Sequence, residues 1–498
     1  MNIAILLDMA ADTWPTRTAV CCSGQSLTYE ELRRLAAATA RRLRECGARS
    51  LAFLDLNGPA AAVALYGAAR AEVPHVPLNY RLSRGEIESL LRRLDEPLIV
   101  AASSQLEGLR LPADAQLTHS EALLREAPGQ VAPVHAIEHD PDAIAVQLFT
   151  SGTTGAPKAA VLRHAHLSAY VIATVEFGGA GEDEAALISV PPYHIAGVAA
   201  LLSSTYAGRR MVMLPEFDAA AWLELAAVER ATQAFLVPTM LGRIVGQLQL
   251  SGEVPPSTLR AIAYGGGGMP GTVIERAMQH FPAVDFTNAY GLTETSSTIC
   301  LLGAEDHRSA LASEDSEVRA RLGSVGRPLP AVEVQIRDEA GNALGAGRHG
   351  LVFVRGTQVS GEYRESGSQL DADGWFGTRD RGWIDEAGYV FLDGRADDVI
   401  VRGGENISPG EIEAVLREHP AVYDAAVFAI ASEEWGEAVG AAVVPLPSRN
   451  VTTVELQDWV RARLRGSRVP ERVMLCDQLP YNDMGKLLRR ELRREFGG

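Results

Sequence analysis

Lysine is nearly absent from this 498-residue chain, which has two lysines, Lys158 and Lys486, against 44 arginines. A lysine side chain is a compact, mobile cation with three rotatable donors, whereas arginine presents a wide planar fork. A site that needs one small cation at one oxygen atom would tolerate arginine poorly. The two lysines are therefore candidates for ligand-binding cations, and the motifs around them must decide the point.

Cysteine is scarce as well. The five cysteines are an odd number with no CxxC or Cys/His ligand spacing, which excludes a disulfide framework and a structural zinc site. No run approaches the roughly 20 apolar residues of a membrane helix. The amino terminus lacks a basic leader and carries Asp8 where a signal peptide would stay apolar. We therefore expect a cytoplasmic protein with reduced thiols and no membrane span.

Positive charge is also in deficit. The net charge of −17 argues against a nucleic-acid partner, because phosphate backbones are bound by clustered positive charge. The hydrophobic content of 47% and the charged content of 22% are typical of a globular protein. A length of 498 residues exceeds the roughly 250–300 residues of a single core, which predicts at least two domains. The oligomeric state stays open, and a homodimer is compatible with the sequence.

The texture of the chain predicts an α/β protein. Helical periods alternate with short apolar runs over residues 1–320, as in βαβ units around layered, mostly parallel sheets. Short alternating strands over about 325–393 predict a small β subdomain, which completes an amino-terminal domain of residues 1–393. Residues 394–398 are the expected hinge, and 399–498 the smaller, mobile α+β domain.

Three helix starts are predicted within this organisation. Thr28 and Glu31 have the spacing of a capping box that opens a helix, and so do Ser408 and Glu411, with Pro409 at the first helical position. A last basic helix is expected to begin at Lys486.

The setting of the first lysine is the stretch TSGTTGAPK, residues 150–158, which follows a strand-like run at 143–149 and precedes a segment that we expect to be helical. Its glycines permit unusual φ angles and close backbone approach, while Ser151, Thr153 and Thr154 supply hydroxyls beside exposed amides. The stretch is therefore predicted to cradle phosphate. It is not a Walker A loop, which requires GxxxxGK[ST].

TSGTTGAPK resembles the signature loop of the adenylate-forming superfamily, which includes acyl-CoA synthetases, amino-acid adenylation domains and luciferases. Further stretches resemble the landmarks of that superfamily in the same order along about 340 residues. They are YGGGGMP (264–270), NAYGLTET (288–295), GSVGRPLP (323–330), TRD (378–380), GRADDVIVRGGENISPGEIE (394–413) and MGKLLRREL (484–492).

The resemblance implies a nucleotide site. Attack of a carboxylate on the α-phosphate of ATP brings negative charges together, so donors and cations are needed there. By resemblance, Ser151, Thr153, Thr154 and Lys158 bind the phosphates, Glu294 binds Mg²⁺ and Thr293 contacts the α-phosphate. The remaining nucleotide-binding residues implied by the resemblance are Gly266, Gly267 and Tyr290, with Asp380 and Arg395 at the ribose hydroxyls.

The resemblance also implies how the second lysine acts. Lys486 would reach from the small domain to the α-phosphate and the substrate carboxylate as the acyl-adenylate forms. Asp397 would be the hinge about which that domain turns between two half-reactions. Gly403 and Gly404 would line the channel for the pantetheine arm of coenzyme A.

His194 stands where acyl- and aryl-CoA ligases place a ring near the substrate carboxylate, so it is expected to be catalytic. The acyl pocket is expected between 194–198, 264–269 and 288–298, where small and apolar residues favour a hydrophobic carboxylic acid. Two residues depart from the family pattern: Arg379 and Ala159 each stand where the family usually has glycine.

The predicted function is that of an acyl-CoA synthetase using ATP, Mg²⁺ and coenzyme A, with an acyl-AMP intermediate and pyrophosphate release. The alternative is a stand-alone adenylation enzyme that loads the acid onto the phosphopantetheine of a carrier protein. A luciferase-like oxygenase would share the motifs. A non-enzymatic binding protein would be expected to lose Lys486 or Glu294, and both are present.

Overall fold

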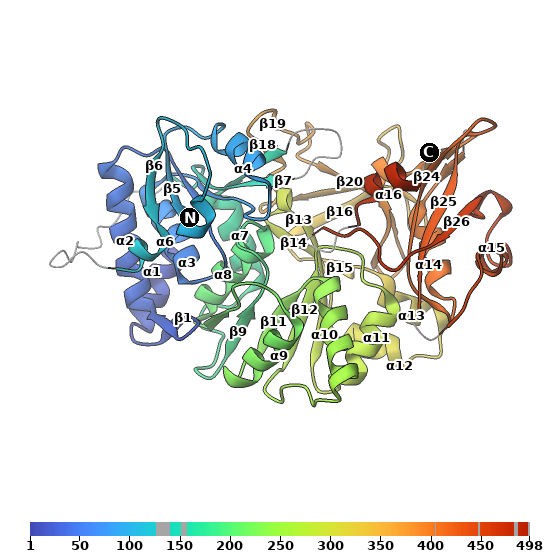
Figure 1. Cartoon of the computed structure of the whole chain (residues 1–498), viewed down its shortest axis with the longest axis horizontal. Coiled ribbons are helices and arrows are strands. Elements are labelled where there is room, and N and C mark those ends of the chain that lie inside the picture. The colour runs from blue at the N-terminus through green and yellow to red at the C-terminus, as the bar shows by residue number, and fades with distance from the viewer. Residues whose placement is uncertain (126–139, 151–156, 404, 447–448, 483–486, 497–498) are drawn as a thin grey trace.

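The computed structural model describes residues 1–125, 140–150, 157–403, 405–446, 449–482 and 487–496. These residues form a large amino-terminal domain with three sheets and a smaller carboxy-terminal domain, at the right of Figure 1. The predicted α/β class, with a β subdomain and a small α+β domain, is confirmed. No helix in the described ranges is long and apolar enough to cross a membrane.

One sheet of the large domain has nine strands in the described part of the chain. Its central strands are parallel and antiparallel strands flank them at both edges. The strands lie in the order β15 (Arg327–Pro328), β14 (Ser297–Leu302), β13 (Asp285–Leu292), β12 (Ala261–Gly265), β11 (Gln233–Leu236), β9 (Ala185–Ile188), β10 (Arg210–Met213), β1 (Thr18–Cys22) and β2 (Gln25–Thr28).

A second sheet of the large domain has eight strands among the described residues. Its order is β19 (Gly367–Ser368), β18 (Glu362–Tyr363), β8 (Lys158–Arg163), β7 (Ile144–Thr150), β4 (His75–Pro77), β3 (Ser50–Leu54), β5 (Pro97–Ala101) and β6 (Gln116–His119). Strands β18 and β19 come from a hairpin about 200 residues downstream of β8. This long-range pairing brings residues of the β subdomain against the strand that follows the predicted phosphate loop.

Helices cover and connect these two sheets. Helix α3 contacts β3 of one sheet and β1 of the other, and its buried alanines belong to the core that the two sheets share. The helices of this domain are α1 (Ala4–Thr13), α2 (Tyr29–Glu45), α3 (Pro59–Ala71), α4 (Arg84–Leu91), α5 (Ser103–Leu106), α6 (Ser120–Leu123), α7 (His164–Thr174), α8 (Ile195–Ala207), α9 (Ala219–Val228), α10 (Pro238–Ser251), α11 (Gly271–His280), α12 (Ala304–Ala312) and α13 (Ser316–Ala320), with the 3-10 turns η1 (Thr293–Thr295) and η2 (Arg321–Gly323).

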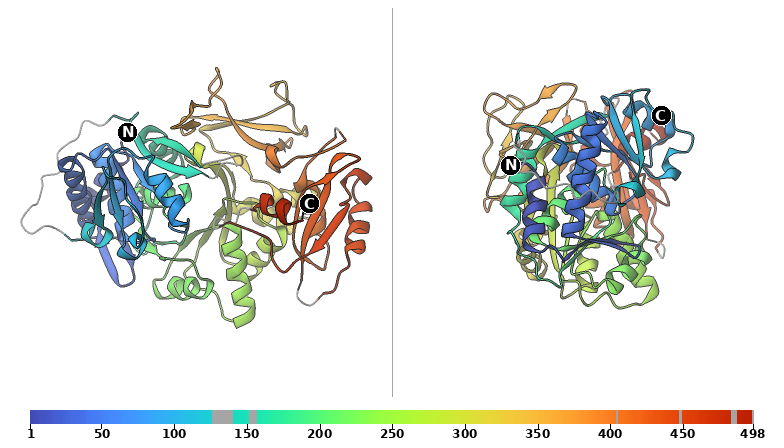
Figure 2. Two further views of the ribbon diagram at one scale, coloured as in Figure 1. Left: turned by 45° about the horizontal axis from the view of Figure 1, so that its top comes forward. Right: turned by 90° about the vertical axis from the view of Figure 1, so that its left-hand side faces the viewer.

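The β subdomain is an antiparallel sheet of β16 (Val332–Arg337), β17 (Gly350–Gly356), β20 (Phe376–Ile384) and β21 (Val390–Arg395). Figure 2 shows this sheet, in pale orange, beside the small domain in red. Buried residues of β16 and β17, with Phe376 of β20, lie in one apolar cluster with Ile299 and Cys300 of β14. That packing fixes the subdomain on the nine-stranded sheet.

The small domain is a five-stranded sheet among the described residues. It comprises β22 (Ile400–Arg402), β23 (Glu405–Ile407), β24 (Val422–Ser432), β25 (Gly436–Pro445) and β26 (Arg472–Leu475), with α14 (Pro409–Arg417), α15 (Thr453–Arg461), α16 (Arg489–Phe496), η3 (Ala396–Asp398) and η4 (Gly466–Arg468). Apolar residues of α14 and α15 pack in one cluster, and Leu492 of α16 packs in another. Alternating residues of β24 divide between these clusters, so helices cover both faces of the sheet.

The predicted first residues of helices agree with the structure more often than the predicted capping boxes do. The capping box of Thr28 and Glu31 is confirmed. The one predicted at Ser408 is wrong, although α14 begins there with Pro409: the Ser408 hydroxyl is turned to the carbonyl of Asp393 in β21, to which it donates at 2.5 Å, and it accepts no amide of the helix. A contact with another element has replaced a local one.

Two further expectations need correction. The segment after the phosphate loop is strand β8 and not a helix, since its buried run from Ala159 to Leu162 pairs with β7 and a short apolar run does not reveal its period. The last helix begins at Arg489 rather than at Lys486, because the preceding Leu487 pairs with Tyr481 and the Leu488 amide donates to the carbonyl of Pro480.

Candidate active site

The phosphate loop predicted from the sequence joins β7 to β8. Ser151, Thr153 and Thr154 lie outside the described residues, but both ends of the loop are described. Thr150 and Lys158 are cross-strand partners, so the predicted phosphate-binding lysine stands at the base of the loop. Its Nζ lies 5.2 Å from the ring centroid of Tyr363 in β18, within the range of a cation–π contact.

Glu294 lies in η1, the turn that connects β13 to β14. Its side chain is buried, and Tyr363 donates its hydroxyl to Oε1 at 2.5 Å. The backbone oxygen of Glu294 accepts the amides of Ser360 and Gly361. The predicted Mg²⁺ ligand is therefore held at both its main chain and its side chain by one segment, with half-buried Thr293 beside it.

The turn that carries Glu294 is fixed by its own sequence. The hydroxyl of Thr295 accepts the amide of Leu292 at 2.9 Å and donates to nearby carbonyls. Ser296 and Ser297 follow with φ of 56° and 104°, in the region that ordinary residues avoid. Such backbone costs of order 1–3 kcal/mol for each residue and is concentrated at functional sites.

The predicted ribose-binding residues form a second cluster. Asp380 in β20 and Arg395 in β21 are cross-strand partners, and Arg395 Nη1 lies 3.0 Å from Asp380 Oδ1. Tyr290 of β13 donates to Oδ2 of the same carboxylate at 2.5 Å. Burial, with the charge of Asp380 added, raises the pKa of Tyr290 far above its ordinary value, so the phenol keeps its proton. The cluster offers a carboxylate and a guanidinium, which suit the hydroxyls of a sugar.

The two clusters adjoin. Tyr290 and Glu294 belong to the same short β13–η1 segment, and the pKa of Tyr363, raised by burial and by Glu294, is lowered in part by the charges of Arg379 and Arg395. A carboxylate for a cation and a pair for a sugar therefore lie side by side.

Arg379 explains why glycine is usual at its position. Its φ is 64°, in the left-handed region that glycine enters at little cost. The side chain turns toward the predicted hinge, where its Nη1 lies 3.8 Å from Oδ2 of Asp397 in η3. The departure from the family pattern has thus created an ion pair between the ribose-side strand and the hinge.

The glycine-rich loop at 264–270 follows β12 at its carboxyl end. Gly266 has a φ of 84°, and Gly267 is exposed beside it. A Cβ on Gly265 would lie 2.1 Å from the carbonyl oxygen of Ala289 in β13. Because β12 and β13 are parallel neighbours, this loop and the β13–η1 turn lie at the same edge of the sheet.

His194 precedes α8 in an aromatic group, with its ring 4.4 Å from that of Tyr193. Burial, with a contribution from the charge of Arg81, lowers its pKa to about 3, so the ring is neutral. Its Nε2 is buried and makes no hydrogen bond to a described residue. A neutral ring with an available nitrogen can serve a substrate carboxylate, which is the role that the resemblance implies for His194.

The small domain contributes Gly403, which turns between β22 and β23 with a φ of 56°. A Cβ there would lie 2.7 Å from the indole of Trp435, which is partly exposed. Gly404 and Lys486, the other predicted residues of this domain, lie outside the described residues. Arg489, three residues after Lys486, donates to Asp398, Glu413 and the carbonyl of Val427.

Sequence reasoning missed several residues that shape this region. Tyr363 was not singled out, nor were Arg93 and Glu365, which pair with each other at the exit of the phosphate loop. Arg93 donates to the carbonyl of Pro157 at 2.7 Å, and Glu365 accepts the amide of Ala159 at 3.2 Å. No local signal would have found them, because their partners lie 64 to 272 residues away in the chain.

His307 was missed in the same way. The sequence placed Tyr264 at the acyl pocket, but its ring packs in the core of the nine-stranded sheet and its hydroxyl meets Nε2 of His307 at 2.7 Å. Since Nδ1 of His307 lies 2.8 Å from the carbonyl of Gly303, Nδ1 donates and Nε2 accepts.

The site suits Mg²⁺ bound together with nucleotide. Among the described residues no group of three or more His, Cys, Asp or Glu side chains could hold a metal on its own. Glu294 has a buried side chain, and its partner Tyr363 also lies against the phosphate-loop lysine. One or two carboxylates plus substrate phosphates and waters is the set that Mg²⁺ commonly takes in proteins.

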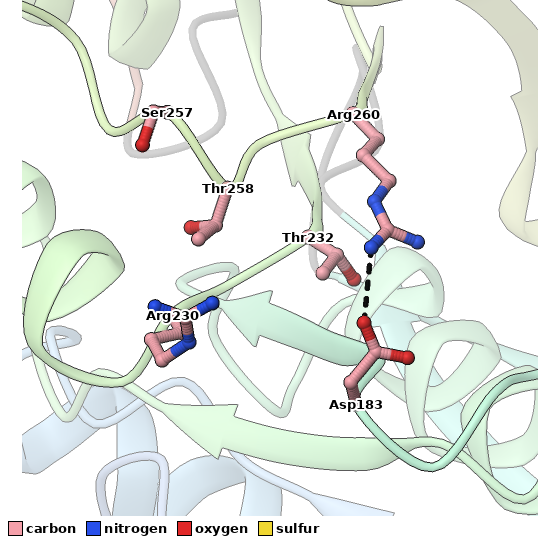
Figure 3. Close-up of a pocket in the computed structure, with 6 residues that line it drawn as sticks. All are labelled: Asp183, Arg230, Thr232, Ser257, Thr258 and Arg260. Carbon is pink, nitrogen blue, oxygen red and sulfur yellow. Dashed lines mark hydrogen bonds and ion pairs between the residues drawn. The ribbon is translucent and has the colours of Figure 1, made fainter.

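A surface cavity elsewhere does not belong to this site. Figure 3 shows it lined by Asp183, Arg230, Thr232, Ser257, Thr258 and Arg260. These residues precede β9, β11 and β12, whereas ligands of parallel sheets collect at the carboxyl ends of the strands. Arg260 and Asp183 also pair with each other at 2.9 Å.

Known proteins match the chain over nearly its whole length. Feruloyl-CoA synthase of Amycolatopsis sp is 31% identical, over 97% of this chain and 99% of the relative. The fatty acid–[acyl-carrier-protein] ligase ScoC of Streptomyces coeruleorubidus is 32% identical, over 97% and 94%. The o-succinylbenzoate coenzyme A synthetase of Bacillus subtilis, solved with ATP and magnesium ion, is 29% identical with a TM-score of 0.82, over 98% and 99%.

Two family models also match, AMP-binding enzyme over residues 7–364 and AMP-binding enzyme C-terminal domain over 411–486. The first covers more than half of the chain and spans the phosphate loop, the Glu294 turn and Tyr363. The chain therefore belongs to the AMP-binding enzymes of the adenylate-forming superfamily.

Proposed function

We propose that the chain is an AMP-forming acid–thiol ligase that converts a hydrophobic carboxylic acid, ATP and coenzyme A into an acyl-CoA. The observation that carries the proposal is the adjacency of two clusters: Glu294 with Lys158 and Tyr363, and Asp380 with Arg395 and Tyr290. One suits a metal-bound phosphate chain and the other a ribose. The feruloyl-CoA synthase relative supports the same activity.

The reaction would proceed in two steps. A carboxylate oxygen of the acid attacks the α-phosphorus of ATP, the bond to the β-phosphate breaks, and pyrophosphate leaves. The thiol sulfur of coenzyme A then attacks the acyl carbon, the bond to AMP breaks, and the thiol proton passes to solvent. Negative charge gathers at the α-phosphate in the first step, so cations and donors placed there would lower its barrier.

Each predicted residue has a role in this scheme. Lys158, with Ser151, Thr153 and Thr154, would bind the departing phosphates. Glu294 would hold Mg²⁺, whose charge offsets that of the phosphates when bound. Thr293 and Lys486 would contact the α-phosphate, while His194, neutral and buried, would orient the carboxylate. Gly266, Gly267 and Tyr290 would border the nucleotide, with Asp380 and Arg395 at the ribose.

The scheme also assigns roles to the domains. Residues 1–393 would form the adenylating core and 399–498 a domain that turns about 394–398, with Asp397 as its pivot. The Ser408–Asp393 hydrogen bond spans this segment and the Arg379–Asp397 ion pair joins β20 to a residue within it, so both are contacts that such a turn would change. Gly403 and Gly404 would approach the pantetheine arm in the second step.

Loading of a carrier protein is the second candidate, because a relative 32% identical to the chain is a fatty acid–[acyl-carrier-protein] ligase. The two activities share the first step and differ only in the molecule that carries the thiol. Four arginines of the small domain, at 461, 463, 465 and 468, are candidates for binding the 3′-phosphate of coenzyme A. Arg461 pairs with Asp458, Arg463 packs over Trp459, and Arg468 pairs with Glu405 and Glu411.

The test is a pyrophosphate-release assay over fatty, aryl, dicarboxylic and polycyclic acids, followed by thioester detection with coenzyme A or a holo carrier protein. We expect release with at least one hydrophobic acid and thioester formation with coenzyme A. Thioester only on the carrier protein would favour the second candidate. No acid-dependent release across the panel would contradict both.

The setting of the enzyme stays a prediction. All five cysteines are free thiols, which supports a reducing compartment such as the cytoplasm. A homodimer likewise stays a prediction.

A further inference from the structure

Tyr363 touches three parts of the nucleotide site from one position. Its hydroxyl donates to Glu294 Oε1, its ring faces Lys158 Nζ, and its backbone pairs with Ala160 in β8. Both the carboxylate and the cation that it contacts are residues assigned above to the metal and the phosphates. No sequence motif assigned a role to Tyr363.

The hydrogen bond to Glu294 fixes the orientation of a carboxylate. At 2.5 Å it is at the short end for a hydroxyl donating to a carboxylate oxygen, and hydrogen bonds of this kind are the stronger ones. With Oε1 engaged, Oε2 is the oxygen that remains for a cation.

The ring of Tyr363 acts on Lys158 independently of the hydroxyl. A cation within about 6 Å of a tyrosine ring is attracted by its electron-rich face. Lys158 therefore has a preferred resting place beside the loop before nucleotide arrives, and the hydroxyl and the ring can be removed separately.

We infer that Tyr363 is a positioning residue for the phosphate end of the site, orienting the Glu294 carboxylate toward the nucleotide-bound divalent cation through its hydroxyl and steadying Lys158 through its ring. The inference rests on the proposed function, because it takes Glu294 as the cation ligand. It goes beyond that proposal because it attributes the orientation of Glu294 and Lys158 to a residue of the β18–β19 hairpin.

Tyr363→Phe removes the hydroxyl alone. We expect the Mg²⁺ concentration for half-maximal adenylation to rise about tenfold, with the rate at saturating Mg²⁺ within about threefold, since partners that orient ligands typically contribute 10- to 100-fold to metal affinity. Mn²⁺ binding to enzyme with a non-hydrolysable ATP analogue, followed by electron paramagnetic resonance, should weaken by the same factor. Unchanged Mn²⁺ affinity in Tyr363→Phe would overturn the inference.

Tyr363→Leu removes the ring as well. Beyond the Mg²⁺ effect it should raise the KM for ATP by a further two- to fivefold, the change that corresponds to loss of a cation–π contact. Equal KM values in the Phe and Leu variants would remove the ring from the inference.

Tyr389→Phe is the matched control. Tyr389 donates to Asp306 at 2.6 Å, so this variant also breaks a tyrosine–carboxylate hydrogen bond in the large domain, away from the nucleotide site. It should leave Mn²⁺ affinity unchanged. A loss of Mn²⁺ affinity equal to that of Tyr363→Phe would mean that the effect comes from a general loss of structural order in the large domain.

Glu294→Gln separates the inference from the proposed function. If this variant binds Mn²⁺ with the analogue as tightly as the unaltered enzyme, the assignment of Glu294 fails and the inference fails with it. If it binds weakly while Tyr363→Phe binds normally, only the inference fails.

Discussion

Two buried glutamates, one in each domain, are satisfied in opposite ways. Glu413 of α14 is 4% exposed; it pairs with Arg489 at 2.5 Å, has Arg417 at 3.9 Å, and accepts the amide of Val427. Glu294 is 8% exposed, and among the described residues its side chain accepts a hydrogen bond from the neutral phenol of Tyr363.

The difference separates structure from function. A buried carboxylate that is paired with guanidinium groups has its charge neutralised inside the protein, and Glu413 links α14 to α16 through Arg489. A buried carboxylate held by a phenol accepts a hydrogen bond from a neutral group, and no ion pair with a described residue occupies it, so it can take up a ligand cation. Burial alone would have classed the two glutamates together, whereas their partners distinguish them.

The largest expected effect on stability is that of removing the buried glutamate that forms ion pairs, Glu413. Glu413→Ala leaves Arg489 and Arg417 without their shared counter-charge, and removal of one partner of a buried ion pair costs about 3–5 kcal/mol. We expect that loss in the free energy of unfolding of the small domain, measured by urea denaturation.

Two variants bracket this prediction. Glu411→Ala breaks the partly exposed pair with Arg468 and should cost below about 1 kcal/mol. Glu294→Gln should also cost little stability. A stability loss for Glu294→Gln as large as that of Glu413→Ala would erase the distinction between the two glutamates.

The proposed catalytic contribution of the small domain can be tested at Lys486. Lys486→Ala should lower the rate of acyl-adenylate formation about 100- to 1,000-fold, the usual result of removing one electrostatic donor from developing charge. Thioester formation from supplied acyl-adenylate should be spared. The measurements are pyrophosphate release and single-turnover thioester formation, and equal loss of both half-reactions would refute the assigned role.

Two buried histidines extend the comparison, because burial lowers their pKa values. Burial lowers the pKa of His75 and of His194 to about 3, against about 6.5 in the unfolded chain. The unfolded chain binds more protons between these values, so the stabilisation is fully present above pH 6.5 and is lost as the pH falls toward 3.

Each of these histidines should lower the free energy of unfolding by about 2 kcal/mol when the pH falls from 7 to 5. Denaturation midpoints at the two pH values measure the slope, and His75→Gln should reduce it by the share of one histidine. An unchanged slope in that variant would show that His75 is already protonated in the folded protein.

The smallest effect concerns the exposed ion pair at the hinge. Arg379→Gly removes the cost of a left-handed arginine and should raise the free energy of unfolding by about 1 kcal/mol, while the Asp397 pair that it loses is partly exposed and contributes less. Arg379→Ala loses the same pair but keeps the strained backbone. Denaturation should therefore rank Gly above Ala, and the reverse order would mean that the backbone is not strained.

Much of the site was readable from the sequence because its motifs are local. The Glu294 turn is determined by Thr295 and its neighbours, and Lys158 and Lys486 stand out by their rarity. The helix expected after the phosphate loop was wrong because a run of four buried residues carries no clear period. The cap at Ser408 was wrong because the Ser408 hydroxyl is turned to the backbone carbonyl of Asp393, which belongs to another element.

The sequence by itself determined the family and the α/β class, since both follow from composition, periodicity and short motifs; the domain bounds and the residues that face the nucleotide stay predictions. Only the tertiary structure decided which partner each buried charge receives. Tyr363 reaches Glu294 across 69 residues and Arg489 reaches Glu413 across 76. Pairings at such separations depend on how sheets and helices pack, and no local pattern encodes them.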